Sequence, residues 1–253
     1  MGKLLDMLER ASSGVRQSMG FSAISRGEKV SPMLLLGCAG EDADSAAKRI
    51  VEAGLDGALL AAGKKGQAAS TRKTLAGMAW GIWQNEAGPQ REEGADFEVF
   101  SSDETPLSVL NSEEHTAIMQ VSPEMDDALL RCIEDVPVDA FLVSIADVPS
   151  LTVRQLMRIA RVRSVVSKYL LVHLATLPSK EDMAHLRDTG VDAMVVDVTS
   201  HSLDALKACR AELQELPHAT PQRRRDRPAP LLPQMSLAAG PEPQEDEDDD
   251  EYE

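Results

Sequence analysis

The chain has 253 residues, of which 43% are hydrophobic and only 3% aromatic, so a large core must be built from aliphatic side chains. Its formal net charge is −16, but nine of the acidic residues lie in 242–253 and the rest of the chain carries only −7. This charge provides no basic surface for binding nucleic acid, and no apolar run is long enough to span a membrane.

The first 30 residues are predicted to form a helix followed by a loop. Leu4, Leu5 and Leu8 recur at helical spacing, and Ser12-Ser13-Gly14 ends the pattern. We expect this amphipathic helix either to cover one end of the domain or to meet a partner. Residues 13–30 show no periodicity, which is typical of a loop.

Residues 31–217 alternate between strand-like and helix-like segments. The predicted strands are 33–37, 57–60, 78–83, 97–100, 116–121, 140–144, 169–174 and 193–197. The predicted helices are 42–53, 64–73, 105–111, 123–134, 151–165, 179–189 and 202–216. Strict alternation of this kind indicates a parallel sheet with helices packed outside it.

A short motif containing Asp precedes every second strand. In 186–197 a helix ends in charged residues, Gly190 can adopt the left-handed conformation that stops it, and an apolar strand follows. Weaker copies place Asp56, Asp96 and Asp139 ahead of their strands, as Asp192 is here. A two-unit period suits a (β/α)8 barrel, whose interior layers come from alternate strands. We therefore predict a small, partly degenerate (β/α)8 TIM barrel, with an open doubly wound sheet as the alternative.

Residues 186–197 resemble the closing unit of TIM-barrel enzymes such as thiamine-phosphate synthase, the tryptophan-biosynthesis barrels and the aldolases. In those enzymes a helix that ends in Gly-x-Asp precedes the eighth strand. The resemblance is to the superfamily at the level of the fold and indicates no specific family. The connections after the last two predicted strands contain no glycine, so the glycine-rich phosphate-binding turns of those enzymes are not found here.

In such a barrel the functional site lies at the C-terminal ends of the strands. Alternation places His173 and Asp197 on corresponding faces of neighbouring strands, so both can point into the mouth. A carboxylate beside an imidazole raises its basicity, and we predict His173 as a general base oriented by Asp197. The alternative is a hydrogen-bonded structural pair, or a His173 that faces a helix.

Four other strand-end residues are candidates for ligand binding: Cys38, Gln84, Gln120 and Ser144. Cys38 can equally be ordinary core packing, because a small buried cysteine is common at strand ends. The three cysteines are far apart and form no Cys-x-x-Cys pair, and no histidine motif has metal-ligand spacing. The sequence predicts no metal site and indicates no particular cofactor.

Residues 218–253 are Pro- and Arg-rich and then acidic, a composition typical of a disordered tail. Leu231 and Leu232 within it are candidates for docking to a partner protein. The sequence leaves two functions open: an enzyme of lyase or isomerase type that binds a small molecule at the mouth, or a non-catalytic barrel that serves as a scaffold. The cysteine content and the lack of a signal-peptide pattern favour the cytoplasm, without nucleic-acid or membrane partners.

Overall fold

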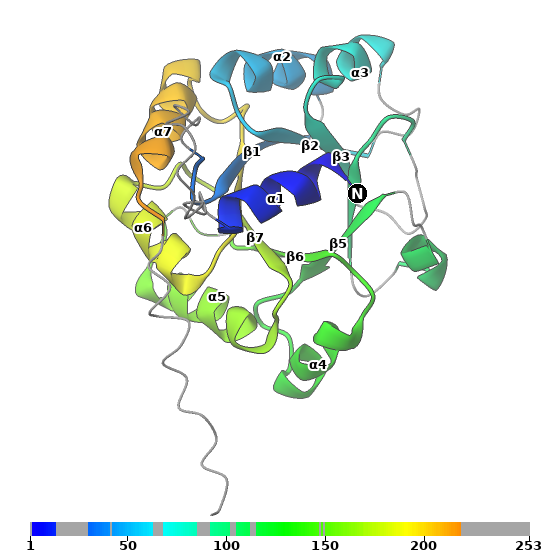
Figure 1. Cartoon of the computed structure of the whole chain (residues 1–253), viewed down its shortest axis with the longest axis vertical. Coiled ribbons are helices and arrows are strands. Elements are labelled where there is room, and N and C mark those ends of the chain that lie inside the picture. Colours follow the sequence, from blue (N-terminus) through cyan, green and yellow to red (C-terminus); the bar gives the residue numbers. More distant parts are fainter. Residues whose placement is uncertain are drawn as a thin grey trace, which may run out of the picture. The chain divides into compact units, whose positions relative to one another are not determined.

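A computed structural model describes residues 2–13, 30–40, 42–62, 68–84, 92–101, 105–111, 115–146, 148 and 150–218 (Figure 1). The strands are β1 (Leu34–Ala39), β2 (Gly57–Ala61), β3 (Ala79–Trp83), β4 (Phe97–Ser101), β5 (Thr116–Val121), β6 (Ala140–Ser144), β7 (Tyr169–Leu174) and β8 (Ala193–Asp197). The α-helices are α1 (Lys3–Ser13), α2 (Ala43–Ala53), α3 (Ala69–Leu75), α4 (Asp127–Cys132), α5 (Val153–Val165), α6 (Lys180–Thr189) and α7 (Leu203–Glu215). Two 3-10 helices are η1 (Leu107–Asn111) and η2 (Ile133–Asp135).

The eight strands form a closed parallel barrel in chain order. Each strand pairs with its successor, and β8 returns to pair with β1, where Leu36 lies opposite Val195. Helices α2 to α7 lie around the outside of this wall, whereas α1 lies across one end of it (Figure 1). The predicted (β/α)8 barrel is therefore confirmed, and the alternative of an open doubly wound sheet is wrong because no strand edge is left between β8 and β1 in the described chain.

Two apolar layers result from the alternation of side chains along each strand. One layer fills the barrel interior and includes Leu36, Leu142, Leu171 and Val195. The other layer lies between the strands and the surrounding helices. It contains outward-facing strand residues, such as Leu35, which alternate with the inward-facing ones. Because the chain has few aromatic residues, both layers are built mainly from Leu, Val, Ile and Ala.

Helix α1 closes one end of the barrel. Leu4, Leu8 and Ala11 are buried and belong to the interior layer. The Asp96 carboxylate, at the start of β4, accepts hydrogen bonds from the backbone N–H groups of Lys3 at 2.6 Å and Leu4 at 2.7 Å. These bonds satisfy donors that the first turn of a helix leaves free. The sequence-based prediction of an end-covering helix is confirmed.

The repeated Asp residues have a common structural role. In three of the four copies, the carboxylate accepts a hydrogen bond from the second backbone N–H of the preceding strand: Asp56 from Leu35 (2.8 Å), Asp139 from Ala117 (2.8 Å) and Asp192 from Leu170 (2.9 Å). In all four copies the Asp backbone N–H also donates to the carbonyl of that same strand position. Each motif thus clamps an even-numbered strand to its predecessor. Asp96 keeps the backbone bond, to Trp80, but its carboxylate caps α1 instead.

Two predicted helices differ from the structure at their ends. The helix predicted over 64–73 is found as α3, Ala69–Leu75, while residues 63–67 lie outside the described chain. The helix predicted over 123–134 begins only at Asp127, because the Asp126 side chain caps it by accepting from the Ala128 N–H. It then tightens into η2. The predicted stop at Gly190 is confirmed, with φ of 94°.

By its internal contacts the chain divides into two units, Met1–Ala219 and Thr220–Glu253. The first contains the whole barrel. The predictions of a disordered tail and of docking through Leu231 and Leu232 concern residues outside the described chain. No helix in the described segments has the length and apolar character needed to cross a membrane.

Candidate functional site at the barrel mouth

The C-terminal ends of the strands bring several polar side chains to the mouth of the barrel. Cys38, Gln120, Ser144 and His173 continue the inward-facing alternation of β1, β5, β6 and β7. They come from segments up to 135 residues apart in the sequence. Closure of the barrel is what makes β1 a near neighbour of β7.

His173 is the centre of this group. Its Nδ1 lies 3.0 Å from the Ser144 Oγ on the adjacent strand, and its Nε2 lies 3.5 Å from the Cys38 Sγ. The indole of Trp83 meets the imidazole edge-on, with ring centroids 4.9 Å apart. A neutral imidazole has one donor and one acceptor nitrogen, so the hydroxyl and the thiol take opposite hydrogen-bonding roles.

Burial determines the protonation states of His173 and Cys38 at neutral pH. It lowers the pKa of His173 below its ordinary value, and the nearby Asp197 charge only partly opposes the shift. Burial also raises the pKa of the Cys38 thiol to about 12, and the Asp197 charge adds to that increase. The mouth therefore holds a neutral imidazole beside a protonated thiol, rather than a thiolate–imidazolium pair.

Asp197 does not form the predicted direct pair with His173. One carboxylate oxygen accepts from the backbone N–H and the hydroxyl of Thr199, at 2.8 and 2.7 Å, and the other accepts from the Ser200 hydroxyl at 2.6 Å. Asp197 is the last residue of β8, and a carboxylate in that position readily hydrogen-bonds the turn two residues on. Burial alone would raise the pKa of Asp197, but these hydrogen bonds outweigh it and lower the pKa. Asp197 acts on His173 through its charge.

The two glutamine candidates lie on opposite sides of the wall. Gln120 faces the mouth, where its Oε1 accepts a hydrogen bond from the Trp83 Nε1–H at 3.0 Å. Gln84 is buried outside the barrel interior, where its Nε2 donates to the Glu98 Oε2 at 2.9 Å. The prediction of Gln84 at the mouth is corrected, because it follows Trp83 and the alternation turns it to the other face. Gln84 instead supports a buried carboxylate.

Trp83 is the mouth residue that the sequence analysis did not select. Its side chain reaches from β3 to His173 on β7, the strand opposite, and hydrogen-bonds Gln120 on the way. The alternation that located His173 also runs through Ala79, Gly81 and Trp83. Applied to β3, it would have predicted an inward-facing indole at the mouth.

No group of three or more His, Cys, Asp or Glu side chains in the described segments is arranged to hold a metal ion. In the described segments the hydrogen-bonding groups at the mouth include the Ser144 hydroxyl, the Cys38 thiol, the Gln120 amide, the His173 imidazole and the Trp83 indole N–H, and Asp197 adds a carboxylate that is already engaged. This set suits the recognition and proton transfer of an organic ligand.

Solved structures share this architecture. Tryptophan synthase from M. tuberculosis matches with a TM-score of 0.53 and 15% identity, over 72% of this chain and 91% of that chain. Thiamine phosphate pyrophosphorylase from Pyrococcus furiosus matches with a TM-score of 0.53 and 16% identity, over 72% and 96%. A mutant tryptophan synthase alpha-subunit from the same hyperthermophile gives 0.52 and 10%, over 72% and 97%.

The chain has a TIM-barrel fold. At these identities the likeness concerns the fold alone, and the similar barrels are enzymes by name. No protein-family model matches the sequence, and no curated protein matches it. The chemistry of this TIM barrel must therefore be argued from its own mouth residues.

Thiol chemistry offers a test of the mouth environment. Ellman's reagent at pH 8 should modify one thiol of the native protein rapidly, the exposed Cys132, because Cys38 and Cys209 are buried with pKa values raised to about 12 and about 11. Cys132→Ser should remove the fast phase, and denaturant should expose all three thiols. A fast phase that survives in Cys132→Ser and disappears in Cys38→Ser would contradict a buried, protonated Cys38.

A second test concerns the pH dependence of His173. Because its folded-state pKa is lowered, the unfolded chain binds more protons at mildly acidic pH. The free energy of unfolding should therefore fall as pH drops from about 6.5, the ordinary histidine pKa, to the lowered folded-state value. Urea denaturation across this range should show the fall, and His173→Gln should lack that part of it.

The Cε1–H resonance of His173 gives the same quantity directly by NMR. Its titration midpoint should lie below 6.5, with His173→Gln supplying the assignment. A midpoint above 6.5 would mean that the Asp197 charge outweighs burial, and would reverse the predicted pH dependence.

Proposed function

We propose that this TIM barrel binds a small organic molecule at its C-terminal mouth and transfers a proton with His173, in a reaction of lyase or isomerase type. The observation that carries the proposal is the neutral His173 held between Ser144 and Cys38 and covered by Trp83. A neutral imidazole with a lowered pKa is free to accept a proton at pH 7.

The contacts around His173 divide into a strong one and a weak one. Ser144 at 3.0 Å on Nδ1 fixes the ring plane, whereas the Cys38 sulfur at 3.5 Å makes a weak contact with Nε2. In the proposed reaction a substrate C–H or O–H replaces the thiol at Nε2, and Ser144 continues to orient the ring. His173 is then the general base and Ser144 a positioning residue.

Trp83 and Gln120 provide recognition in this proposal. The indole offers a flat apolar surface, and the Gln120 amide offers both a donor and an acceptor. A substrate enters by displacing or stacking on the indole, so the proposed ligand is a compact planar or carbonyl-bearing molecule. The negative charge of Asp197 stabilises His173 once the imidazole has taken up a proton.

A thermal-shift screen of the full chain against a metabolite library tests the proposal. A true ligand at about 100 times its Kd adds about 2.7 kcal/mol to the free energy of unfolding, which raises Tm by several degrees. The increase should be lost in His173→Ala and in Trp83→Ala. His185→Ala, an exposed histidine on α6, is the matched control and should keep the full shift.

Proton transfer is then measured with the ligand so found. Solvent-deuterium exchange at a ligand carbon or hydroxyl, followed by NMR, should depend on His173 and fall at least a hundredfold in His173→Gln. A ligand whose thermal shift is the same in His173→Ala, or whose exchange is unchanged in His173→Gln, overturns the assignment of His173.

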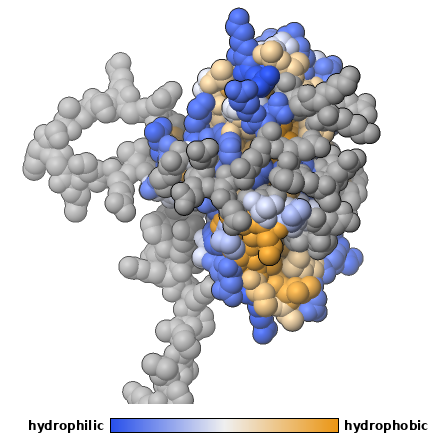
Figure 2. Space-filling model, turned by 90° about the vertical axis from the view of Figure 1, so that its right-hand side faces the viewer, coloured by the Kyte–Doolittle hydropathy of each residue, from blue (hydrophilic) through white to orange (hydrophobic). Residues whose placement is uncertain are grey.

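A second candidate is a non-catalytic barrel that serves as a scaffold. Large apolar side chains are exposed on the packed helices α4 and α5, namely Leu129, Val153 and Met157. Figure 2 shows apolar residues gathered in the lower part of one face of the molecule, although much of that face is hydrophilic. Under this proposal Met157→Glu, or deletion of 218–253 with Leu231 and Leu232, removes partner binding, while His173→Ala leaves it intact.

A further inference from the structure

The connection from β8 to α7 directly follows Asp197 and is held by a side chain from a different helix. Arg49, on α2, donates from Nε to the Val198 carbonyl at 3.1 Å and from Nη2 to the His201 carbonyl. Both donors lie on one edge of the planar guanidinium, so a single side chain spans the two carbonyls. Arg49 thus ties the helix that follows β1 to the connection that follows β8.

The two carbonyls that Arg49 binds bracket the turn that holds the Asp197 carboxylate. Between them in the sequence lie Thr199 and Ser200, which supply the three hydrogen bonds that the carboxylate accepts. The Arg49 bonds are partly buried, whereas the bonds to Asp197 are exposed. Water therefore competes less with Arg49 than with the hydroxyl groups of the turn, and Arg49 is the firmer of the two supports.

Close packing keeps Arg49 within reach of this turn. A Cβ at Gly37, on β1, would lie 2.6 Å from the Val198 side chain and 2.7 Å from that of Ile50, the residue after Arg49. Both side chains are fully buried and occupy the space that Gly37 leaves open. Helix α2 and the turn after β8 therefore pack on the same part of the wall.

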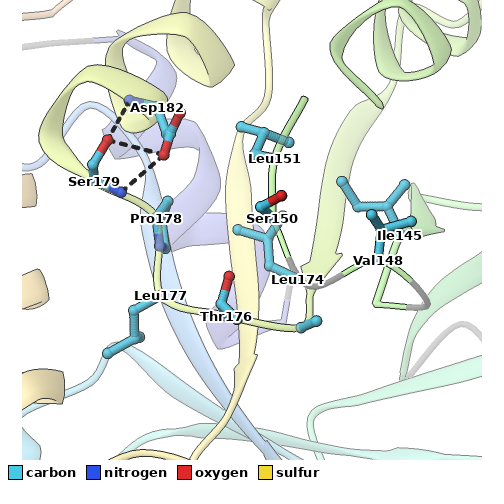
Figure 3. A pocket seen from close by; sticks show the side chains of 11 residues that line it. Ile145, Val148, Ser150, Leu151, Leu174, Thr176, Leu177, Pro178, Ser179 and Asp182 are labelled. Atoms are coloured by element: carbon cyan, nitrogen blue, oxygen red, sulfur yellow. Dashed lines mark hydrogen bonds between the residues drawn. The ribbon is translucent and has the colours of Figure 1, made fainter. Parts of the chain in front are cut away.

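The neighbouring connection, from β7 to α6, is held differently. The Asp182 Oδ2 accepts from the Ser179 N–H at 3.1 Å and from its hydroxyl at 2.9 Å, beside the pocket that this connection helps to line (Figure 3). This capping box lies within the segment that it supports. The turn after β8, which holds the carboxylate whose charge acts on His173, is instead held from outside by α2.

We propose that Arg49 is a positioning residue for the proton transfer proposed for His173, on which this inference rests. By holding the turn after β8, Arg49 keeps the Asp197 carboxylate where its charge stabilises the protonated imidazole. When the turn is released, water replaces the three donors to the carboxylate, and hydration screens its charge. His173 then takes up a proton less readily.

A direct and an indirect action of Arg49 on His173 have opposite signs. Acting directly, the Arg49 cation would disfavour the imidazolium, so its removal would raise the pKa of His173. Acting through Asp197, its removal weakens the effect of the carboxylate and lowers that pKa further. The direction of the change therefore separates the two.

The other titratable groups near His173 are kept constant in this comparison. Among the described residues Cys38 contacts the ring and Asp197 acts on it by charge, while His201 acts on Asp197 from the turn. Burial raises the pKa of Cys38 to about 12, so the thiol stays protonated across the histidine range. His201→Gln removes the second imidazole and keeps the backbone carbonyl that Arg49 binds, so the effect of Arg49 should persist in that background.

The titration midpoint of the His173 Cε1–H resonance, measured by NMR on the full chain without ligand, is the test. In Arg49→Gln it should fall by at least half of the decrease caused by Asp197→Asn. Arg49→Lys should also lower it, because an ammonium keeps the charge but lacks the planar fork. In the Asp197→Asn background, Arg49→Gln should cause no further decrease. An unchanged or raised midpoint in Arg49→Gln overturns the proposal.

Matched variants separate this role from general loosening of the mouth. Lys48→Gln removes the exposed neighbouring cation on α2, and Ser179→Ala weakens the connection after β7; both should keep the wild-type midpoint. Ser200→Ala removes one donor to Asp197 without changing Arg49 and should lower the midpoint, which keeps the proposal testable if Arg49→Gln does not fold. A decrease in Ser179→Ala equal to that in Arg49→Gln overturns the specific role of Arg49.

The exchange reaction then connects this role to the proposed function. With a ligand found by the thermal-shift screen, solvent-deuterium exchange in Arg49→Gln should be slower than in the wild type and no slower than in Asp197→Asn. Exchange at the wild-type rate, despite a lowered midpoint, overturns the role of Arg49 in the reaction. Exchange that does not depend on His173 overturns the proposed function instead, and the midpoints still report whether Arg49 holds Asp197 in place.

Discussion

Asp192→Ala should lower the free energy of unfolding by about 3 kcal/mol, because it removes a carboxylate from a buried position with two partners. Asp192 is 8% exposed, accepts from the Leu170 N–H at 2.9 Å and lies 3.7 Å from the Arg163 guanidinium. Truncation leaves a backbone donor and a cation without this carboxylate. Urea denaturation followed by circular dichroism measures the change as a lower midpoint at unchanged slope.

Asp139→Ala is the matched control for this prediction. Asp139 occupies the same place in its own copy of the motif and accepts from the Ala117 N–H at 2.8 Å, but it is exposed to solvent. Its replacement should cost only about 1 kcal/mol, since water can satisfy the freed N–H. Equal losses for the two variants would show that burial does not decide the strength of these clamps.

Gly81→Ala should destabilise the barrel by about 3 kcal/mol or prevent folding. A Cβ at this position would lie 2.4 Å from both the carbonyl oxygen and the ring of Phe97. Gly81 is the register partner of Phe97, so the carbonyl cannot retreat without breaking the pairing of β3 with β4. The variant should also displace Trp83, two residues on, and thereby alter the mouth.

Thermal denaturation of Gly81→Ala and Gly77→Ala, side by side, gives the measurement. An added Cβ at Gly77 meets nothing within 4 Å, so that variant should be neutral or slightly more stable. If Gly81→Ala melts at the wild-type temperature, β3 and β4 are less closely packed than described. A Phe97→Leu background should recover only part of the loss, because the clash with the carbonyl remains.

The barrel could be predicted from the sequence because its periodic signals agree with one another. Gly190 stops α6 in the left-handed conformation, Ser179 and Asp182 form the predicted capping box, and alternation along β7 and β8 turns His173 and Asp197 inward. The Asp repeat was visible as a pattern. The structural role of these Asp residues could not be predicted, because each carboxylate binds the second N–H of the preceding strand only when the two strands are paired.

The details of the mouth depend on contacts that the sequence does not encode locally. Asp197 and His173 have matching orientations, yet the turn that follows β8 takes up the carboxylate. Cys38 was a candidate in isolation, and its contact with His173 follows from closure of the sheet. Trp83 was not among the candidates, although the alternation along β3 places its indole at the mouth. Gln84 was predicted at the mouth, but it directly follows the inward-facing Trp83 and therefore points to the outer face, where it binds Glu98.

The Asp clamps also bear on where the polypeptide can be cut and rejoined. Asp56, Asp139 and Asp192 each bind the strand directly before their own, so these bonds fall within the pairs β1–β2, β5–β6 and β7–β8. The connection from β4 to β5 lies between pairs, and new termini placed there keep every clamp inside a continuous segment. New termini in the connection from β7 to β8 would instead separate Leu170 from Asp192, so that their hydrogen bond would join the two ends of the permuted chain. Circular permutants of this barrel should therefore be tolerated at the boundaries between strand pairs and resisted within them.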